Sequence, residues 1–114
     1  MMLRGMLLAG GLVLASITAS AEETAIDGAE LFRRTCAMCH GPDGKATTPV
    51  AKRMGVKDLS TSQLTDEQIR GAIETGIRGA KGVMPAYGGR FSEAELAAIV
   101  QYVRSFRAAE NDAK

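Results

Sequence analysis

The 114-residue sequence is short of the residues that build large apolar cores and many catalytic sites. It has no tryptophan, two tyrosines, three phenylalanines, one histidine and two cysteines. A small chain with so few aromatic residues builds a modest core, and such domains usually need a disulfide, a metal or a bound group for stability. One histidine and one pair of cysteines also exclude a second cluster of soft metal ligands.

Charge of one sign is lacking as well, because 14 Lys and Arg stand against 13 Asp and Glu. The sequence therefore offers no basic excess for nucleic acid and no polybasic arm for an anionic membrane surface. Its apolar runs are shorter than the roughly 20 residues that span a bilayer. We expect neither nucleic-acid binding nor stable membrane insertion.

The amino-terminal segment has the pattern of a secretory signal peptide. Arg4 gives it a positive start, residues 6–17 are apolar, and the small residues at 19–21 precede a cleavage site. An uncleaved membrane anchor is the alternative, which the short apolar stretch disfavours. We predict a signal peptide at 1–21 and one domain at 22–114, exported to a bacterial periplasm or a thylakoid lumen.

The most informative stretch is the C-x-x-C-H run from Cys36 to His40. This pattern is the attachment signature of a c-type haem. Two thiols at this spacing can add across the two vinyl groups of a porphyrin from one helical turn, and the next residue places an imidazole beneath the iron. The run predicts one haem c, covalently bound through Cys36 and Cys39, with His40 as an iron ligand.

Three other readings of the same residues are weaker. A structural zinc site needs about four protein ligands, and the sequence offers only Cys36, Cys39 and His40 as soft candidates. A thioredoxin-like redox pair belongs in a βαβ setting, which the surrounding sequence does not indicate. A structural disulfide across so short a loop would stabilise little.

Helix signals outnumber strand signals in the predicted domain. An aspartate N-cap opens a helix at 28–37, and a capping box of the form T-x-x-Q opens another at 65–75. A second capping box starts the longest helix, at 92–108, whose apolar residues recur at helical spacing. We predict a loop with one helical turn at 45–62, a glycine-rich loop at 77–90 and no strand pair. The predicted fold class is all-α, with three or more helices around one haem.

The second axial ligand is predicted by elimination. His40 alone leaves one iron position open, and there is no other histidine. Met38 lies inside the attachment loop on the proximal side, and Met54 lies in the next loop, where methionine more often fills a core. Met84 precedes Pro85, which fixes the backbone of a glycine-rich loop. We predict Met84 as the ligand, with Met54 as the alternative.

These features resemble class I cytochromes c of the small bacterial kind. The resemblance rests on residues 36–41, residues 84–89 and the closing helix 96–103. It implies covalent haem, His40 and Met84 as axial ligands, and a soluble carrier of single electrons.

The resemblance also implies particular packing contacts. In that family the first and last helices cross at a glycine and an aromatic residue. Gly28 and Phe32 correspond to one side of this crossing, and Ile99 and Tyr102 to the other. A proline after the motif offers its carbonyl to the proximal imidazole N–H, a role that falls to Pro49 and would fix the ring orientation.

An iron with two protein ligands changes oxidation state without changing ligands, and a methionine sulfur favours the ferrous state. We therefore expect a positive potential, no enzyme activity of its own, and transient docking to redox proteins. Lys45, Arg78 and Lys81 are candidate steering charges, and the alternative is that they are ordinary solubility charges. Two alternatives stay open: a haem subunit of a dehydrogenase or oxidase complex, and a gas-binding or sensor protein with a labile Met84. The sequence leaves the oligomeric state open.

The apolar residues expected to bury the porphyrin are Leu31, Phe32, Ile73, Tyr87, Leu96 and Ile99.

Overall fold

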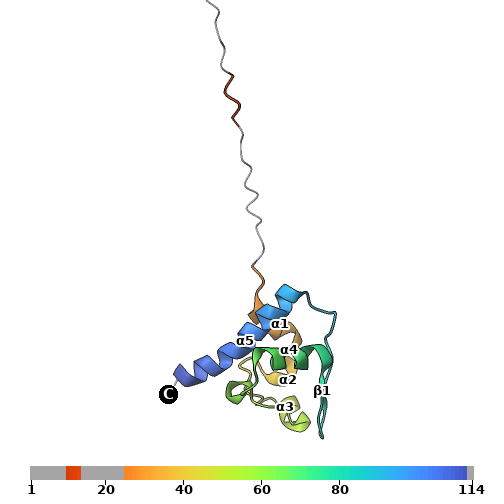
Figure 1. The fold of residues 1–114 in the computed structure, drawn as a ribbon. Coiled ribbons are helices and arrows are strands. Elements are labelled where there is room, and N and C mark those ends of the chain that lie inside the picture. The colour runs from red at the N-terminus through yellow and green to blue at the C-terminus, as the bar shows by residue number, and fades with distance from the viewer. Residues whose placement is uncertain (1–9, 14–24, 113–114) are drawn as a thin grey trace, which may run out of the picture.

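The computed structural model describes residues 10–13 and 25–112. Apart from residues 10–13, the predicted signal peptide at 1–21 lies outside the described residues. The described part is mostly helical, which confirms the predicted fold class (Figure 1). Its helices are α1 (Gly28–Thr35), α2 (Ala37–His40), α3 (Pro49–Met54), the 3-10 turn η1 (Leu59–Thr61), α4 (Asp66–Thr75) and α5 (Glu93–Asp112).

Helix α1 begins at the predicted cap and ends slightly early. The Asp27 carboxylate accepts a hydrogen bond from the Glu30 N–H at 3.2 Å, which satisfies one of the donors left open at a helix start. The helix stops at Thr35, and a turn at Cys36 separates it from α2. The Cys36 N–H still donates to the Phe32 carbonyl at 2.7 Å, so α2 follows directly from α1.

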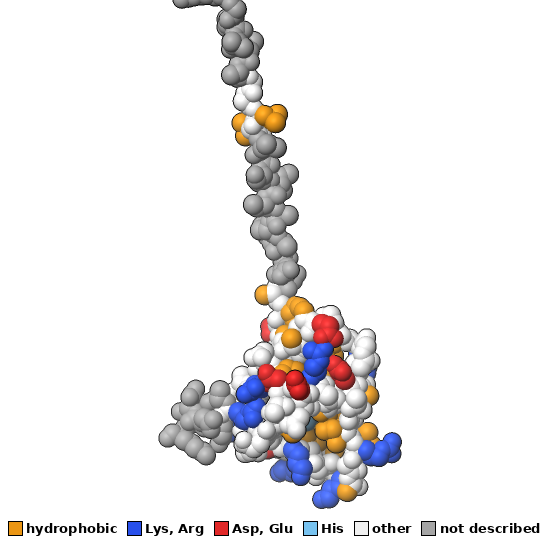
Figure 2. Space-filling model, viewed as in Figure 1, with side chains coloured by type: hydrophobic (Ala, Val, Ile, Leu, Met, Phe, Trp, Pro, Cys, Tyr) orange, Lys and Arg blue, Asp and Glu red, His pale blue; other side chains and the backbone are white. Residues whose placement is uncertain are grey.

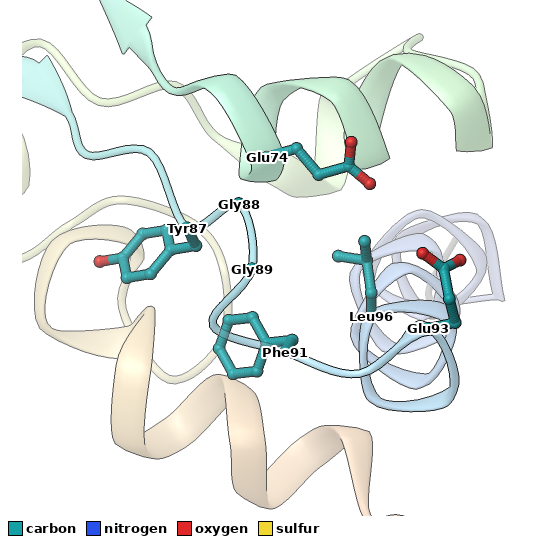
Figure 3. Close-up of a pocket in the computed structure, with 7 residues that line it drawn as sticks. All are labelled: Glu74, Tyr87, Gly88, Gly89, Phe91, Glu93 and Leu96. Atoms are coloured by element: carbon teal, nitrogen blue, oxygen red, sulfur yellow. The ribbon is translucent and has the colours of Figure 1, made fainter.

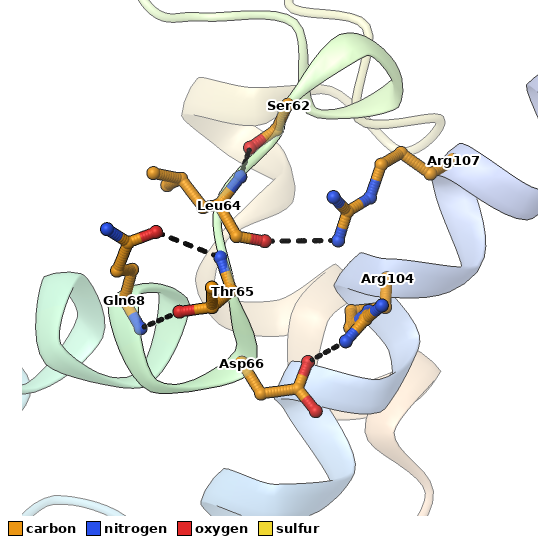
Figure 4. A network of polar contacts seen from close by, with 7 residues as sticks. All are labelled: Ser62, Leu64, Thr65, Asp66, Gln68, Arg104 and Arg107. Atoms are coloured by element: carbon orange, nitrogen blue, oxygen red, sulfur yellow. Dashed lines mark hydrogen bonds and ion pairs between the residues drawn. The ribbon is translucent and has the colours of Figure 1, made fainter.

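Helix α4 begins and ends where the sequence predicts. The Thr65 hydroxyl accepts from the Gln68 N–H at 3.2 Å, and the Gln68 side chain accepts from the Thr65 N–H at 3.0 Å, as Figure 4 shows. This reciprocal pair is a capping box. Gly76 ends the helix with a φ of 74°, a backbone conformation that glycine adopts without a steric penalty.

Helix α5 contacts α1, α4 and η1 and so joins most of the fold (Figure 1). It extends to Asp112, beyond the predicted end near residue 108. Two arginines fasten it to the start of α4 (Figure 4). The Arg104 guanidinium donates to Asp66 at 2.7 Å, and the Arg107 guanidinium donates to the Leu64 carbonyl at 3.1 Å.

The core lies between α1, α4 and α5. Phe32 and Ile99 are its most deeply buried large side chains. The apolar residues that recur at helical spacing along the last helix are Leu96, Ile99, Val100, Val103 and Phe106. The first four are buried, and Phe106 is half-buried against the others. The remaining buried members of this core cluster are Leu31, Ile69 and Ile73.

The crossing of α1 and α5 agrees with the expected one. The rings of Phe32 and Tyr102 meet edge to face, with centroids 5.3 Å apart, a favoured arrangement for aromatic pairs. A Cβ on Gly28 would lie 2.2 Å from the Ala98 carbonyl oxygen. The two backbones therefore approach closely at a position where only glycine fits.

The segment 45–62 is more regular than predicted. The Thr48 hydroxyl accepts from the Ala51 N–H at 3.1 Å and caps α3. Pro49 occupies the first turn of this helix, where its missing N–H is no loss. These two residues explain why a helix forms where apolar periodicity is weak.

The prediction of no strand pair was wrong. Two short antiparallel strands, β1 (Ile77–Arg78) and β2 (Val83–Met84), pair Ile77 with Met84 and Arg78 with Val83. Two glycines make the tight turn between them, where the Gly79 N–H donates to the Gly82 carbonyl at 2.9 Å. Strands of two residues carry no alternation that a sequence pattern can detect.

Candidate haem site

The two cysteines and the histidine share one turn of helix. Cys36 lies in the turn between α1 and α2, and Cys39 and His40 are the last two residues of α2. The His40 N–H donates to the Cys36 carbonyl at 2.9 Å. Both thiols are free and half-buried. The disulfide is therefore not formed, and the turn presents both sulfurs and the imidazole from one short segment, as the sequence predicts.

A bare metal ion finds no comparable set of ligands. Within residues 10–13 and 25–112, no three His, Cys, Asp or Glu side chains gather into a metal site. Burial, with a smaller contribution from Cys39, raises the pKa of Cys36 to about 11. A thiolate ligand is therefore disfavoured at this position, whereas a thioether carries no charge and suits a half-buried place.

The environment of His40 suits an iron ligand. Burial lowers the pKa of His40 below its ordinary value, which favours the neutral imidazole that coordinates a metal. Its Nδ1 atom is buried and has no hydrogen-bond partner. Buried polar atoms are rarely left unpaired, so this atom marks a site whose polar contacts are incomplete in the protein alone.

The contact implied between Pro49 and this imidazole is not made, because Nδ1 has no partner. Pro49 is the first residue of α3, and its carbonyl faces the hydrogen-bond ladder of its own helix. Since α2 and α3 contact one another, the proline does lie on the neighbouring element. The hydrogen bond implied by the family resemblance is therefore absent from this structure.

Met84 is held by its strand and by the loop that follows. Its side chain is half-buried against the core cluster, which Cys36 also contacts. Beyond it, the Tyr87 N–H donates to the Ile73 carbonyl at 2.8 Å. A Cβ on Gly76 would lie 2.5 Å from the Met84 carbonyl oxygen, so the chain reverses tightly behind the methionine.

The other two methionines of the domain lie elsewhere. The side chain of Met38 is 78% exposed, which agrees with its place inside the attachment loop. Met54 ends α3 and is half-buried, and a Cβ on Gly82 would lie 2.9 Å from its Cβ. It therefore packs under the β1–β2 turn, in the filling role that the sequence favoured.

The apolar residues expected to bury the porphyrin belong to one cluster. Five of the six are buried, and Tyr87 is half-buried against them. The sequence analysis missed the β1–β2 hairpin, which sets the position of Met84. The only sequence signal for it was the pair of glycines close to that methionine.

Within the part of the chain that is described, no helix has the length and apolar character needed to cross a membrane.

Comparisons with known proteins agree with this site. The family described as cytochrome C oxidase, cbb3-type, subunit III matches residues 23–103. Cytochrome c6 of Microcystis aeruginosa is 36% identical over 77 residues, which cover 68% of this chain and 90% of that protein. The c-type cytochrome KustC0563, a solved structure, has a TM-score of 0.62 and 27% identity and covers 72% of this chain and 99% of its own.

One relative is much longer. The cbb3-type cytochrome c oxidase subunit FixP of Azorhizobium caulinodans is 36% identical over 84 residues, which cover 68% of this chain but 26% of that protein. The chain thus spans about a quarter of its length. The family model, the two relatives and the solved structure all match a c-type cytochrome domain. The chain belongs to the c-type cytochromes, in the family described as cytochrome C oxidase, cbb3-type, subunit III, and carries haem c bound covalently through Cys36 and Cys39.

Proposed function

We propose that this protein carries single electrons between redox proteins, with His40 and Met84 as the two axial ligands of its haem iron. The observation that supports this most is the common packing of the attachment turn and the Met84 strand. Cys36 and Met84 both pack against the same core cluster, so both residues border one apolar interior. The match to cytochrome c6 over 90% of its length also supports it.

The residues of the site have separate tasks. Bound haem supplies a one-electron iron couple. Cys36 and Cys39 fix the porphyrin to α2, and the neutral imidazole of His40 offers a ring nitrogen on the same side. Met84 offers a soft sulfur from a strand held by pairing with Ile77. Axial ligand identity moves haem potentials over roughly 0.8 V, and the sulfur ligand moves this one upward.

Docking to partners is proposed to be brief and steered by charge. Residues 44–57 and 76–92 contain seven Lys and Arg and no Asp or Glu. The segments meet in space, since a Cβ on Gly55 would lie 3.6 Å from the Lys81 side chain. In Figure 2 the charged side chains on the lower part of the folded unit are mainly Lys and Arg, whereas the acidic side chains gather higher up, with basic ones among them. Such a surface speeds encounters with acidic partners.

The proposed location is outside the cytoplasm, in a periplasm or a thylakoid lumen. This proposal rests on the signal pattern at 1–21. The intact mass of the haem-loaded protein tests it: the mass should equal residues 22–114 plus one haem. A mass that retains residues 1–21 would contradict the proposed cleavage.

A second candidate is a haem subunit held permanently in an oxidase. The family description and the match to FixP favour it. The electron-transfer chemistry would be the same, but the protein would not diffuse. Haem staining of a native gel of the producing cells distinguishes the two: a carrier migrates alone as a small protein, whereas a subunit migrates with a large complex.

The ligand assignment is tested by Met84→Ala in the haem-loaded protein. The oxidised wild type should show the weak near-red absorption of a sulfur–iron bond, and its reduced form should not bind carbon monoxide. Met84→Ala should lose the band, bind carbon monoxide and have a lower midpoint potential. Met54→Ala is the matched control and should retain the band.

Two results would contradict the assignment. A band that survives in Met84→Ala and disappears in Met54→Ala would make Met54 the ligand. A wild type that binds carbon monoxide would favour a gas-binding or sensor protein with a labile Met84 over a carrier.

A further inference from the structure

The loop that carries Met84 has its two ends tied together by one arginine. The loop starts after α4 and ends at α5. The Arg70 guanidinium, on α4, donates through Nε to Glu74 at 3.0 Å and through Nη2 to Glu93, the first residue of α5. Glu93 lies 23 positions after Arg70. This ion pair therefore closes the base of the loop.

The base of the loop is hollow beside this ion pair. A pocket of about 250 Å³ lies there, with Glu74 and Glu93 on the helices and Tyr87 and Phe91 on the loop (Figure 3). Leu96 is the one buried side chain that lines it. Apolar packing is incomplete at this place, because a void removes contacts from the atoms around it. Polar contacts must therefore contribute more to holding the Met84 loop against α4 and α5.

The polar contacts between the loop and α4 are few. The Tyr87 N–H donates to the Ile73 carbonyl at 2.8 Å, and the Gly88 N–H donates to the Glu74 carbonyl at 3.0 Å. Both acceptors lie at the carboxyl end of α4. The position of the loop thus depends on the last turn of α4 keeping its place relative to α5.

Arg70 is the cation that holds that turn. Its guanidinium lies against both Glu74 and Glu93, which otherwise present two negative charges on neighbouring helices. The hydrogen bond to Glu93, more than any other contact, raises the pKa of Arg70 above its ordinary value. Removal of the cation would leave two like charges beside this pocket, and their repulsion favours opening of the loop.

We propose that Arg70 is a positioning residue for Met84: by joining Glu74 to Glu93 it keeps the loop closed and holds the methionine sulfur in place. This inference rests on the proposed role of Met84 as an iron ligand. Arg70 acts through the loop and does not itself touch the ligand set. Its loss should therefore loosen Met84 without removing it.

The test is a titration of the oxidised, haem-loaded protein with imidazole. Displacement of Met84 by imidazole is monitored as the loss of the near-red band. Glu93 is 82% exposed, and exposed ion pairs contribute modestly. Arg70→Gln should lower the imidazole concentration at half displacement by about two- to fivefold. Arg70→Lys should recover part of the difference, and about 1 M salt should reduce it by screening.

Arg104→Gln is the matched control. Arg104 pairs with Asp66 at 2.7 Å and also joins α5 to α4, but at the other end of α4 (Figure 4). The substitution Arg104→Gln likewise removes one arginine and one ion pair between α4 and α5. We expect the imidazole concentration at half displacement to be the same in Arg104→Gln as in the wild type, even if the variant unfolds at a lower denaturant concentration.

The outcomes separate the two proposals. Equal imidazole displacement in Arg70→Gln and wild type, both with the near-red band, would overturn the role of Arg70 and leave Met84 as the ligand. Equal weakening in Arg70→Gln and Arg104→Gln would also overturn it, because the effect would then be general stability. A wild type without the band would overturn the ligand assignment and this inference together.

Discussion

Replacement of Gly28 by alanine is the sharpest test of how the two terminal helices pack. The added Cβ would lie 2.2 Å from the Ala98 carbonyl oxygen and 2.7 Å from its carbon. Ordinary contact begins near 3.4 Å, so the overlap with the oxygen exceeds 1 Å. The obstacle is the helical backbone of α5 at Ala98, which cannot rotate away as a side chain would.

The size of the effect follows from this overlap. Overpacking of a well-packed interior costs about 1–3 kcal/mol, and occasionally more. Alanine in place of glycine in a helix returns up to about 1 kcal/mol, and less at the first helical position. Since Phe32 and Ile99 would separate with their helices, we expect a net loss of about 2 kcal/mol in the free energy of unfolding.

The assay is guanidinium unfolding of the haem-loaded protein, followed by far-ultraviolet circular dichroism. Gly71→Ala is the matched control, because a Cβ at this helical position in α4 meets no atom within 4 Å. It should leave the protein unchanged or stabilise it by up to about 1 kcal/mol. If Gly28→Ala were as stable as Gly71→Ala, the close approach of α1 to α5 would be refuted.

Two further predictions concern the α4 cap and the cationic surface. Thr65→Ala removes the hydroxyl that accepts from the Gln68 N–H, so thermal unfolding should show a loss of about 1 kcal/mol; an unchanged melting temperature would mean that the capping box contributes nothing. Lys81→Glu should slow oxidation of the reduced protein by ferricyanide several-fold at low ionic strength, and salt should remove the difference. Arg33→Glu, the same charge change on α1, is the control, and equal slowing in both variants would argue against a localised surface.

The parts of the fold that the sequence predicted are those with strong local signals. The capping box at Thr65 and the cap at Asp27 place two helix starts correctly, because these side chains bond the adjacent backbone. The attachment run needs only one helical turn to bring its three groups together. The crossing of α1 and α5 was available through the family resemblance, at Gly28 and Phe32.

The missed features depend on contacts between distant segments. The β1–β2 pair lies where Gly82 packs on Met54, and the two glycines of its turn are only a weak signal without that distant contact. The bridge from Arg70 to Glu93 joins two helices across the methionine loop, and no spacing rule connects such positions. The prediction that Pro49 accepts a hydrogen bond from His40 was wrong, and Pro49 is instead the first residue of α3.

The deepest core contact joins opposite ends of the domain, since Phe32 on α1 packs in one cluster with Ile99 on α5. A chain that is still emerging during synthesis cannot complete this contact until its last helix has appeared. Non-local contacts of this kind also delay folding. The thiols of Cys36 and Cys39 follow α1 directly, so they remain accessible on an incompletely folded chain, which gives the attachment of the porphyrin a window before the domain closes.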